Sequence, residues 1–344
     1  MNIWQKSSTP ISLNKPKHGK IAVLLAVLCA LLLGAFFCAL AFGSTPMNLF
    51  RGIGDLLRGD PSADGLILLH IRLPRACAAA LAGAALAVAG VIIQAVLHNP
   101  MAAPNVIGVN SGAGLGAVLM LAVFPSALGA LPLAAFVGAM VTCLCIYAIS
   151  ARTGANRMTV TLVGIAVASL LNAAINTVKI LYPDSVYDAD SFMIGGFSGV
   201  TFSRLFPACL IILAGLLVAC FFAWEMDILA LGDDTAKSLG VNVKRAQLLL
   251  LLLACALAGG AVSFSGLLGF VGLLVPHLAR RFVGENHRIL VPVSALGGAI
   301  LVLVCDMISR VLFAPYELPV GILLSFVGGP FFISLILVGR KRHD

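Results

Sequence analysis

The amino-acid sequence predicts an all-α, polytopic integral membrane protein, built as a helical bundle of about ten transmembrane helices. Only 10% of its 344 residues are charged, 60% are hydrophobic, and the mean hydropathy is +1.07. This composition leaves too few polar side chains to cover a soluble particle of that length. Apolar runs of about twenty residues, the length that crosses a bilayer as a helix, recur along the whole chain. Helix is predicted for them because backbone in hydrocarbon must satisfy its own hydrogen bonds.

The apolar runs define the predicted spans, which lie in order at 21–42, 72–97, 106–124, 131–151, 159–180, 203–224, 245–263, 267–283, 290–312 and 320–338. Ten spans would place both termini on one side of the membrane. When that side is cytoplasmic, most of the 22 Lys and Arg residues fall in cytoplasmic segments, as the positive-inside rule requires. The pI of about 9.2 therefore reflects membrane orientation, and no nucleic-acid partner is predicted.

A single transmembrane domain is expected over residues 21–338, between a basic N-terminal tail (1–20) and a C-terminal tail (339–344), both cytoplasmic. The Ser-, Pro- and Lys-rich composition of the first tail predicts no stable structure. Ala39-Leu40-Ala41 resembles a signal-peptide cleavage site, but the apolar run before it exceeds the usual length of about 7–15 residues, which favours a retained helix. The nine cysteines include no CxxC and no Cys/His cluster, so they are interpreted as small core residues, and no metal site is predicted.

Small and polar residues inside the spans indicate how the helices pack. Gly83, Ala87 and Gly90 recur at helical spacing in the second span, which predicts a face that another helix approaches closely. Asp306 and Arg310 are spaced i, i+4 with the acid first, which predicts an ion pair near the end of the ninth span.

The fifth span carries a stripe of small and polar residues along one helical face, namely Gly164, Ala168, Asn172, Asn176 and Lys179. Amides can pair between packed helices, but a stripe that adds a lysine is costly to bury in a membrane. The stripe is therefore predicted to line a water-filled pathway, with helix packing as the alternative.

Residues 226–240 form a short, amphipathic, partly acidic segment between long apolar runs. Two small helical halves, Asp227–Leu231 and Asp233–Leu239, are expected around Gly232. Asp233 and Asp234 would supply favourable charges at the N-terminus of the second half. A membrane protein that keeps such a segment in water is expected to use it to contact a soluble partner.

The sequence contains no GxxxxGK[ST] phosphate loop, no HExxH and no GxSxG, so no enzymatic activity and no cofactor are predicted. A transporter that cannot hydrolyse ATP itself must be driven by an ion gradient or by a separate protein that supplies the energy. The segment 226–240 favours a separate protein. The alternative is an ion-coupled secondary transporter with Lys179 and His277 as charge sites, although a Pro-kinked helix end at Pro276 also explains that histidine.

Motifs in a fixed order carry a family resemblance over roughly residues 65–335. They are Arg72-Leu-Pro-Arg75, Gly83-Ala-Ala-Leu-Ala-Val-Ala-Gly90 with Gln94 and Asn99-Pro100, Gly108-Val-Asn-Ser-Gly112, Gly195-Gly-Phe-Ser-Gly199, Leu231-Gly-Asp-Asp-Thr-Ala-Lys-Ser-Leu-Gly240, Gly269-Phe-Val-Gly-Leu-Leu-Val-Pro-His-Leu-Ala-Arg280 and Glu317-Leu-Pro-Val-Gly321. The chain thus resembles FecCD-type permeases, the ten-span subunits of ABC importers for ferric siderophores, haem and cobalamin. The resemblance implies a permease subunit of the bacterial inner membrane that moves an iron chelate inward.

The resemblance also implies partners. These are a second permease subunit, identical or homologous, two cytoplasmic ATP-binding subunits that hydrolyse ATP, and a periplasmic or lipid-anchored binding protein. The ATPase-coupling residues that it implies are Leu231, Gly232, Asp233, Asp234, Leu239 and Gly240. The segment Arg152–Thr159 matches the cytoplasmic gate, where Asn156, Arg157 and Met158 replace small hydroxyl residues of the cobalamin importer.

Arg72, Arg75 and Arg310 match the family's extracytoplasmic arginines, which pair with glutamates of the binding protein. Pro74 disfavours helix at Leu73, so the first two arginines are expected at a helix entrance. Cations at a helix N-terminus oppose the helix dipole, so local stability supplies no reason for them there. Anchoring to lipid phosphates is the alternative to docking.

Overall fold

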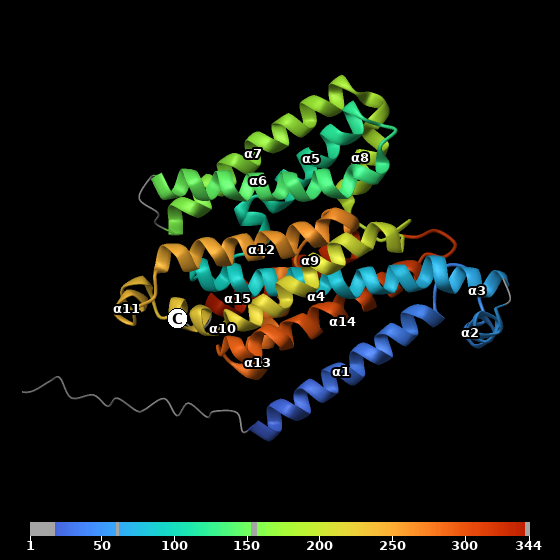
Figure 1. Ribbon diagram of the computed structural model, residues 1–344, viewed down its shortest axis with the longest axis horizontal. Helices are drawn as coiled ribbons and strands as arrows, with labels where there is room; N and C mark the ends of the chain where they lie inside the picture. Colours follow the sequence, from blue (N-terminus) through green and yellow to red (C-terminus); the bar gives the residue numbers. More distant parts are fainter. Residues whose placement is uncertain (1–17, 60–61, 153–156, 341–344) are drawn as a thin grey trace, which may run out of the picture.

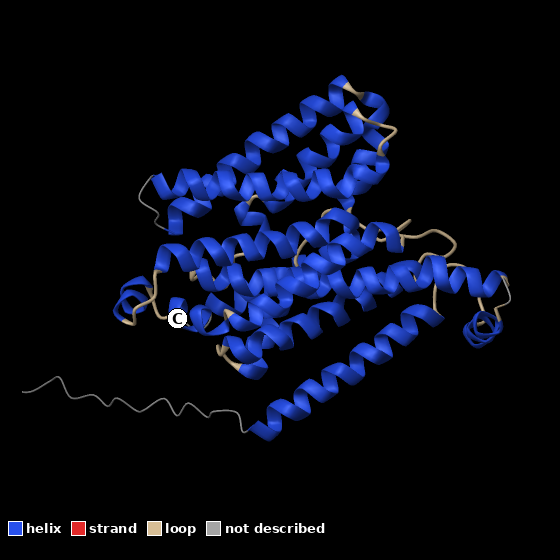
Figure 2. Ribbon diagram, viewed as in Figure 1, coloured by secondary structure: helices blue, strands red, loops and turns tan. Residues whose placement is uncertain are grey.

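The described part of the chain is mostly helical. A computed structural model describes residues 18–59, 62–152 and 157–340. Every regular element within those ranges is a helix, and none is a strand (Figures 1 and 2). The predicted all-α class is therefore confirmed for the described residues.

The helices, in chain order, are α1 (His18–Ala41), α2 (Leu49–Arg58), α3 (Ala63–Ile67), the π-helical turn η1 (Leu68–Arg72), α4 (Leu73–Leu97), η2 (Pro104–Ile107), α5 (Val109–Val123), η3 (Leu128–Ala130), α6 (Leu131–Arg152), α7 (Arg157–Leu181), η4 (Pro183–Ser185), α8 (Val186–Ile194), α9 (Phe202–Phe221), α10 (Ala223–Ala230), α11 (Asp233–Ser238), α12 (Val243–Ser265), α13 (Val271–Val283), α14 (His287–Val311) and α15 (Val320–Arg340). Each predicted span overlaps one of them. The short helices α2 and α8 were not predicted, because neither is long enough to give an apolar run.

Seven helical stretches among the described residues are long and apolar enough to cross a membrane. They are Gly19–Ala41, Ala63–Leu97, Leu131–Ser150, Thr159–Leu181, Phe202–Phe221, Val243–Ser265 and His287–Val311. Two of the other three predicted spans correspond to shorter helices, α5 with 15 residues and α13 with 13, and the third corresponds to α15, whose apolar stretch is Val320–Leu335. The chain is a multi-pass membrane protein, and seven stretches of its described residues are both long and apolar enough for a full span.

The second predicted span starts earlier than expected. Helix begins at Ala63, and the stretch Ala63–Leu97 is 35 residues long. Leu73 is helical, with φ −66° and ψ −50°, although Pro74 disfavours helix there, so the helix entrance predicted at Arg72 and Arg75 was wrong. The π-helical turn Leu68–Arg72 explains this difference. Leu73 N–H donates to the Leu68 carbonyl, so the helical hydrogen bonding continues up to Pro74, which has no N–H to donate.

Helix α4 forms the centre of the bundle, with α12 and α14 running alongside it and α5 to α8 gathered on one side (Figure 1). Glycines let the neighbouring backbones come close. A Cβ on Gly83 would lie 2.1 Å from the carbonyl oxygen of Gly298 in α14, and one on Gly90 would lie 1.8 Å from that of Gly272 in α13. The predicted close-packing face of the second span is therefore confirmed.

The eighth predicted span is shortened by a turn that precedes it. Gly266 and Phe270 both have positive φ, +67° and +66°, so α13 starts only at Val271. Helix α12 ends at Ser265, just before this turn. Gly328 does not break α15, but a Cβ there would lie 2.2 Å from the Phe270 ring, so it is a site of close approach.

Candidate functional site

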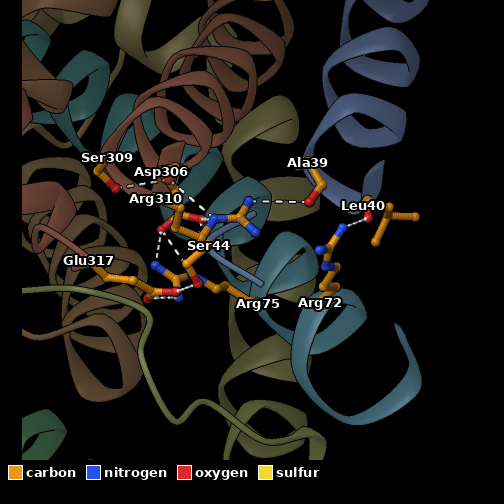
Figure 3. Close-up of polar contacts among 9 residues, drawn as sticks. All are labelled: Ala39, Leu40, Ser44, Arg72, Arg75, Asp306, Ser309, Arg310 and Glu317. Carbon is orange, nitrogen blue, oxygen red and sulfur yellow. Dashed lines mark hydrogen bonds and ion pairs between the residues drawn. The ribbon is translucent and has the colours of Figure 1, made fainter. Parts of the chain in front are cut away.

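Arg75 and Arg310 lie buried in one ion-pair cluster with Asp306 and Glu317, which we call the arginine–carboxylate cluster (Figure 3). The guanidinium of Arg75 is 3.0 Å from Asp306 Oδ1 through Nη2 and 2.5 Å from Glu317 Oε2 through Nη1. Arg310 Nε is 3.1 Å from Asp306 Oδ2, which confirms the predicted i, i+4 pair. One buried carboxylate thus bridges two arginines and joins α4 to α14.

Arg72 has a different set of partners. It donates from Nη1 to the carbonyl of Leu40 at 2.7 Å (Figure 3) and to that of Ala41 at 2.6 Å, and from Nη2 to that of Thr45 at 2.6 Å. Leu40 and Ala41 are the last residues of α1, so Arg72 supplies donors and positive charge where unpaired helix carbonyls need them.

These contacts correct the argument that local stability gives the arginines no reason to be there. The exposed fractions of Arg72, Arg75 and Arg310 are 4%, 7% and 3%. All three are hydrogen-bonded inside the chain, which also leaves them poorly placed to anchor lipid phosphates. The argument about local stability failed because it considered only the dipole of the helix that carries Arg72 and Arg75. It left out the carboxylates and carbonyls that other segments supply.

Glu317 is the more accessible carboxylate of the cluster. Ser44 Oγ donates to its Oε1 at 2.5 Å, and its side chain is 30% exposed. Burial alone would raise the pKa of Glu317, but hydrogen bonds from Ser44 and Arg75 and the charge of Arg75 outweigh burial and lower that pKa. Sequence reasoning missed this residue as a partner, although it opens a quoted motif.

A cleft of about 370 Å³ opens beside the cluster. Arg75 and Glu317 line it together with Arg204, the motif loop Gly196–Val200 and the turn Ser263–Gly266. Charged groups of both signs therefore share this cleft with glycine-rich backbone.

The predicted pathway stripe lies on α7, at one edge of the bundle (Figure 1). Asn172 and Asn176 are exposed, Gly164 is buried, and Ala168 and Lys179 are half-buried. The Lys179 ammonium pairs with the Asp190 carboxylate of α8, a partner that the sequence stripe did not contain. The aliphatic face of α7, opposite the stripe, is exposed as well.

Two of the predicted gate residues begin helix α7, and one precedes it. Asn156 lies outside the described residues, as do the side chains of Arg157 and Met158. His277, the other candidate charge site, packs edge-on against Phe331 with ring centroids 6.0 Å apart.

The segment 226–240 forms two short helices that meet at an elbow. Gly232, between α10 and α11, has φ +111° and ψ 153°, so the predicted break is confirmed. The first half is longer than predicted because it starts at Ala223. Met226, Leu229 and Ala236 are buried and hold the elbow to the bundle.

The outer side of this elbow faces away from the bundle. Leu231 and Leu239 are 65% and 56% exposed, and Gly240 turns the chain back with φ +82°. Asp234 pairs with Lys237 at 3.1 Å, and Asp233 accepts from Gln247 at 3.4 Å. The predicted coupling residues thus form one partly apolar, partly charged surface at the end of the bundle opposite α2 and α3 (Figure 1).

Asp227 fastens the elbow to α14. Its Oδ1 lies 2.7 Å from His287 Nδ1 and accepts the backbone N–H of His287 at 2.9 Å. Burial would raise the pKa of Asp227, but the hydrogen bonds and charge from His287, with the charge of Arg288, lower it. The carboxylate is therefore ionised at neutral pH.

The family model described as the FecCD transport family matches residues 31–338. The chain belongs to the FecCD transport family. Similar proteins include the hemin transport system permease protein HmuU of Yersinia pestis, which is 40% identical over 89% of this chain and 94% of its own length. The Fe(3+)-citrate import system permease protein YfmE of Bacillus subtilis is 34% identical over 96% of this chain and 98% of its own length.

A solved structure agrees with the family assignment. An ABC transporter described as of the metal-chelate type, in an inward-facing conformation, matches with a TM-score of 0.82 and 27% identity. The match covers 92% of this FecCD chain and 99% of the solved one. The chain is therefore a permease of the ABC-importer type.

Proposed function

We propose that this chain is the permease subunit of a binding-protein-dependent ABC importer that takes up a ferric siderophore or related iron chelate across the bacterial inner membrane. The observation that carries the proposal is the exposed elbow of α10 and α11, on a chain without an ATP-binding motif. Family relatives named for hemin and for Fe(3+)-citrate support the class of cargo.

In the proposed topology α5, α13 and α15 lie in the membrane with the seven long helices, which makes ten embedded helices. Both termini are cytoplasmic, so the elbow is cytoplasmic and the arginine–carboxylate cluster is extracytoplasmic. Two such subunits, identical or homologous, enclose the pathway. Two cytoplasmic ATP-binding subunits contact the elbows.

Coupling is proposed to run along α14. This helix begins at His287, which Asp227 of the elbow holds, and carries Asp306 and Arg310 near its other end. A displacement of the elbow would therefore be transmitted to the extracytoplasmic cluster through one continuous helix. The proposal assigns the coupling contact to Leu231, Gly232, Asp233, Asp234, Leu239 and Gly240.

Reconstitution tests the proposed function directly. The chain in proteoliposomes with its ATPase and binding protein is expected to take up the iron chelate only when ATP is supplied. Uptake by the chain alone under a proton gradient would instead identify an ion-coupled secondary transporter and overturn the proposal.

The docking role of Arg72, Arg75 and Arg310 is retained as a proposal in modified form. Since all three arginines are already hydrogen-bonded within the chain, a glutamate of the binding protein would have to displace an internal partner. Glu317 is the candidate for displacement, because its side chain is 30% exposed whereas that of Asp306 is 1% exposed.

Glu317→Gln is accordingly expected to tighten binding-protein docking several-fold, because it removes the charge that competes for Arg75. Dissociation constants measured at low and high salt would test this, since exposed charge pairs weaken with screening. Asp188→Asn is the matched control, because it removes an exposed charge from the same cleft without a contact to these arginines. Unchanged or weaker docking in Glu317→Gln would restrict the arginines to a structural role.

The pathway proposal assigns the lining of the pathway to Gly164, Ala168, Asn172, Asn176 and Lys179, with the gate formed near Asn156, Arg157 and Met158. In membranes, single cysteines at Asn172 and Asn176 are expected to react with water-soluble thiol reagents, at rates that change on nucleotide binding. Leu170→Cys is the control, because Leu170 is 69% exposed in the isolated chain and lipid would cover it. Equal reactivity at all three positions would contradict a pathway along the stripe.

A further inference from the structure

Helix α2 has three distinct faces. At about 100° per residue, Phe50, Ile53 and Leu57 share one face. Phe50 and Leu57 are 77% and 84% exposed, and Ile53 is 40% exposed. Leu49 and Gly52 point to another face and are buried. Arg51 and Arg58 lie on the third face, where both are exposed.

The apolar face belongs to a firmly held helix. Asn48 Oδ1 accepts from Arg51 N–H at the N-terminus, and Gly59, with φ +73°, ends the helix by donating to two carbonyls. Gly52 packs on the backbone of α3, where a Cβ would lie 3.1 Å from the Asp64 carbonyl oxygen. The exposure of Phe50 and Leu57 is therefore fixed by packing.

Position and direction identify what the apolar face meets. The helix α1 is a candidate span that ends at Ala41, and α2 begins at Leu49, so α2 starts within a few residues of the membrane boundary. Figure 1 views α2 nearly along its axis, whereas α4, α12 and α14 lie lengthwise across the picture. A helix crosswise to the spans at their ends lies parallel to the bilayer surface.

We propose that α2 is an interfacial helix that rests in the leaflet into which α1 emerges. Its Phe50–Ile53–Leu57 face is inserted at the boundary between head groups and acyl chains. Arg51 and Arg58, turned about 100° from that face, contact phospholipid phosphates. This arrangement removes large apolar side chains from water and leaves the basic ones in the head-group layer, which is the distribution that interfacial helices require.

The interfacial helix would also hold the end of α1. The segment between α1 and α2 includes Thr45, whose carbonyl accepts from Arg72. Lipid contact on one side and Arg72 on the other would fix the outer end of α1 against α4. The inference depends on the membrane orientation of the helices. It does not depend on the transported substrate or on the ATP-binding subunits.

The test places single nitroxide labels at Phe50→Cys, Leu57→Cys and Arg51→Cys in a cysteine-free full-length chain, in nanodiscs of phosphatidylcholine and phosphatidylglycerol. Collision with oxygen relative to a water-soluble nickel chelate is expected to be about threefold or more higher at positions 50 and 57 than at 51. Equal ratios at all three positions would overturn the proposal.

A second arm distinguishes lipid from a protein partner. Labels at 50 and 57 that are water-accessible in nanodiscs, and become shielded only when the binding protein is added, would identify a protein-docking face and overturn the lipid assignment. Phe50→Trp supplies an independent measurement, in which brominated lipids are expected to quench more fluorescence than in the wild-type protein. No added quenching would contradict insertion.

Discussion

Gly232→Val is expected to lower ATP-driven uptake by the reconstituted importer strongly while leaving the permease folded and inserted. With φ +111° and ψ 153°, Gly232 occupies a region of conformational space that is essentially restricted to glycine. No heavy atom lies within 4 Å of a Cβ built there, so the substitution acts on the backbone alone. A strain of about 1–3 kcal/mol would move α11 away from its native direction.

Uptake and ATP hydrolysis should be measured together, since uncoupling predicts hydrolysis without uptake. We expect uptake to fall by about tenfold or more, because about 1.4 kcal/mol corresponds to a factor of ten. Gly284→Val is the matched control. Gly284 also has positive φ, +74°, and open space around a Cβ, but it lies in the turn between α13 and α14. Normal uptake with normal ATP dependence in Gly232→Val would refute the coupling role, and equal loss in both variants would indicate destabilisation.

Asp306→Asn is expected to destabilise the protein by about 3–5 kcal/mol, which is the cost of leaving a buried charge without its partner. The Asp306 side chain is 1% exposed and accepts from Arg75 at 3.0 Å, while its second oxygen lies 3.1 Å from Arg310. A neutral amide would leave two buried guanidinium groups close together with only Glu317 to balance them. Unfolding in mixed micelles with increasing SDS would measure the loss.

Asp234→Asn is the control for this measurement, because its side chain is fully exposed and its pair with Lys237 is expected to contribute no measurable stability. A second variant separates charge imbalance from a packing defect. Adding Arg310→Met to Asp306→Asn leaves Arg75 opposite Glu317, which removes the surplus positive charge and should recover part of the lost stability. Wild-type stability in Asp306→Asn would show that the cluster does not hold α4 to α14.

Features that depend on composition or on neighbouring residues could be predicted from the sequence. Helical class followed from apolar run length, and the Asp306–Arg310 pair followed from spacing within one helix. The break at Gly232 followed from a glycine between two amphipathic halves. Ordered motifs predicted the FecCD family, which the family model confirms over residues 31–338.

Helix boundaries were harder to predict where backbone geometry compensated for an unfavourable residue. Pro74 was expected to mark a helix entrance, but the preceding π-helical turn carries the helix back to Ala63. The positive φ of Phe270 shortened α13, and no local pattern predicts such a conformation for a phenylalanine. Close approach to Gly328 of α15 explains where that ring is held.

The sequence by itself determined that this chain is an all-helical membrane protein of the FecCD family with a glycine elbow. Only the tertiary structure decided what its buried charges touch. Arg75 meets Glu317 across 242 residues, and Asp227 meets His287 across 60. The first pair is possible because glycine faces let α4 and α14 approach within backbone contact, and the second because α10 packs against the start of α14. Residue type and spacing encode a charge and its helical face, but its partner depends on which helices pack.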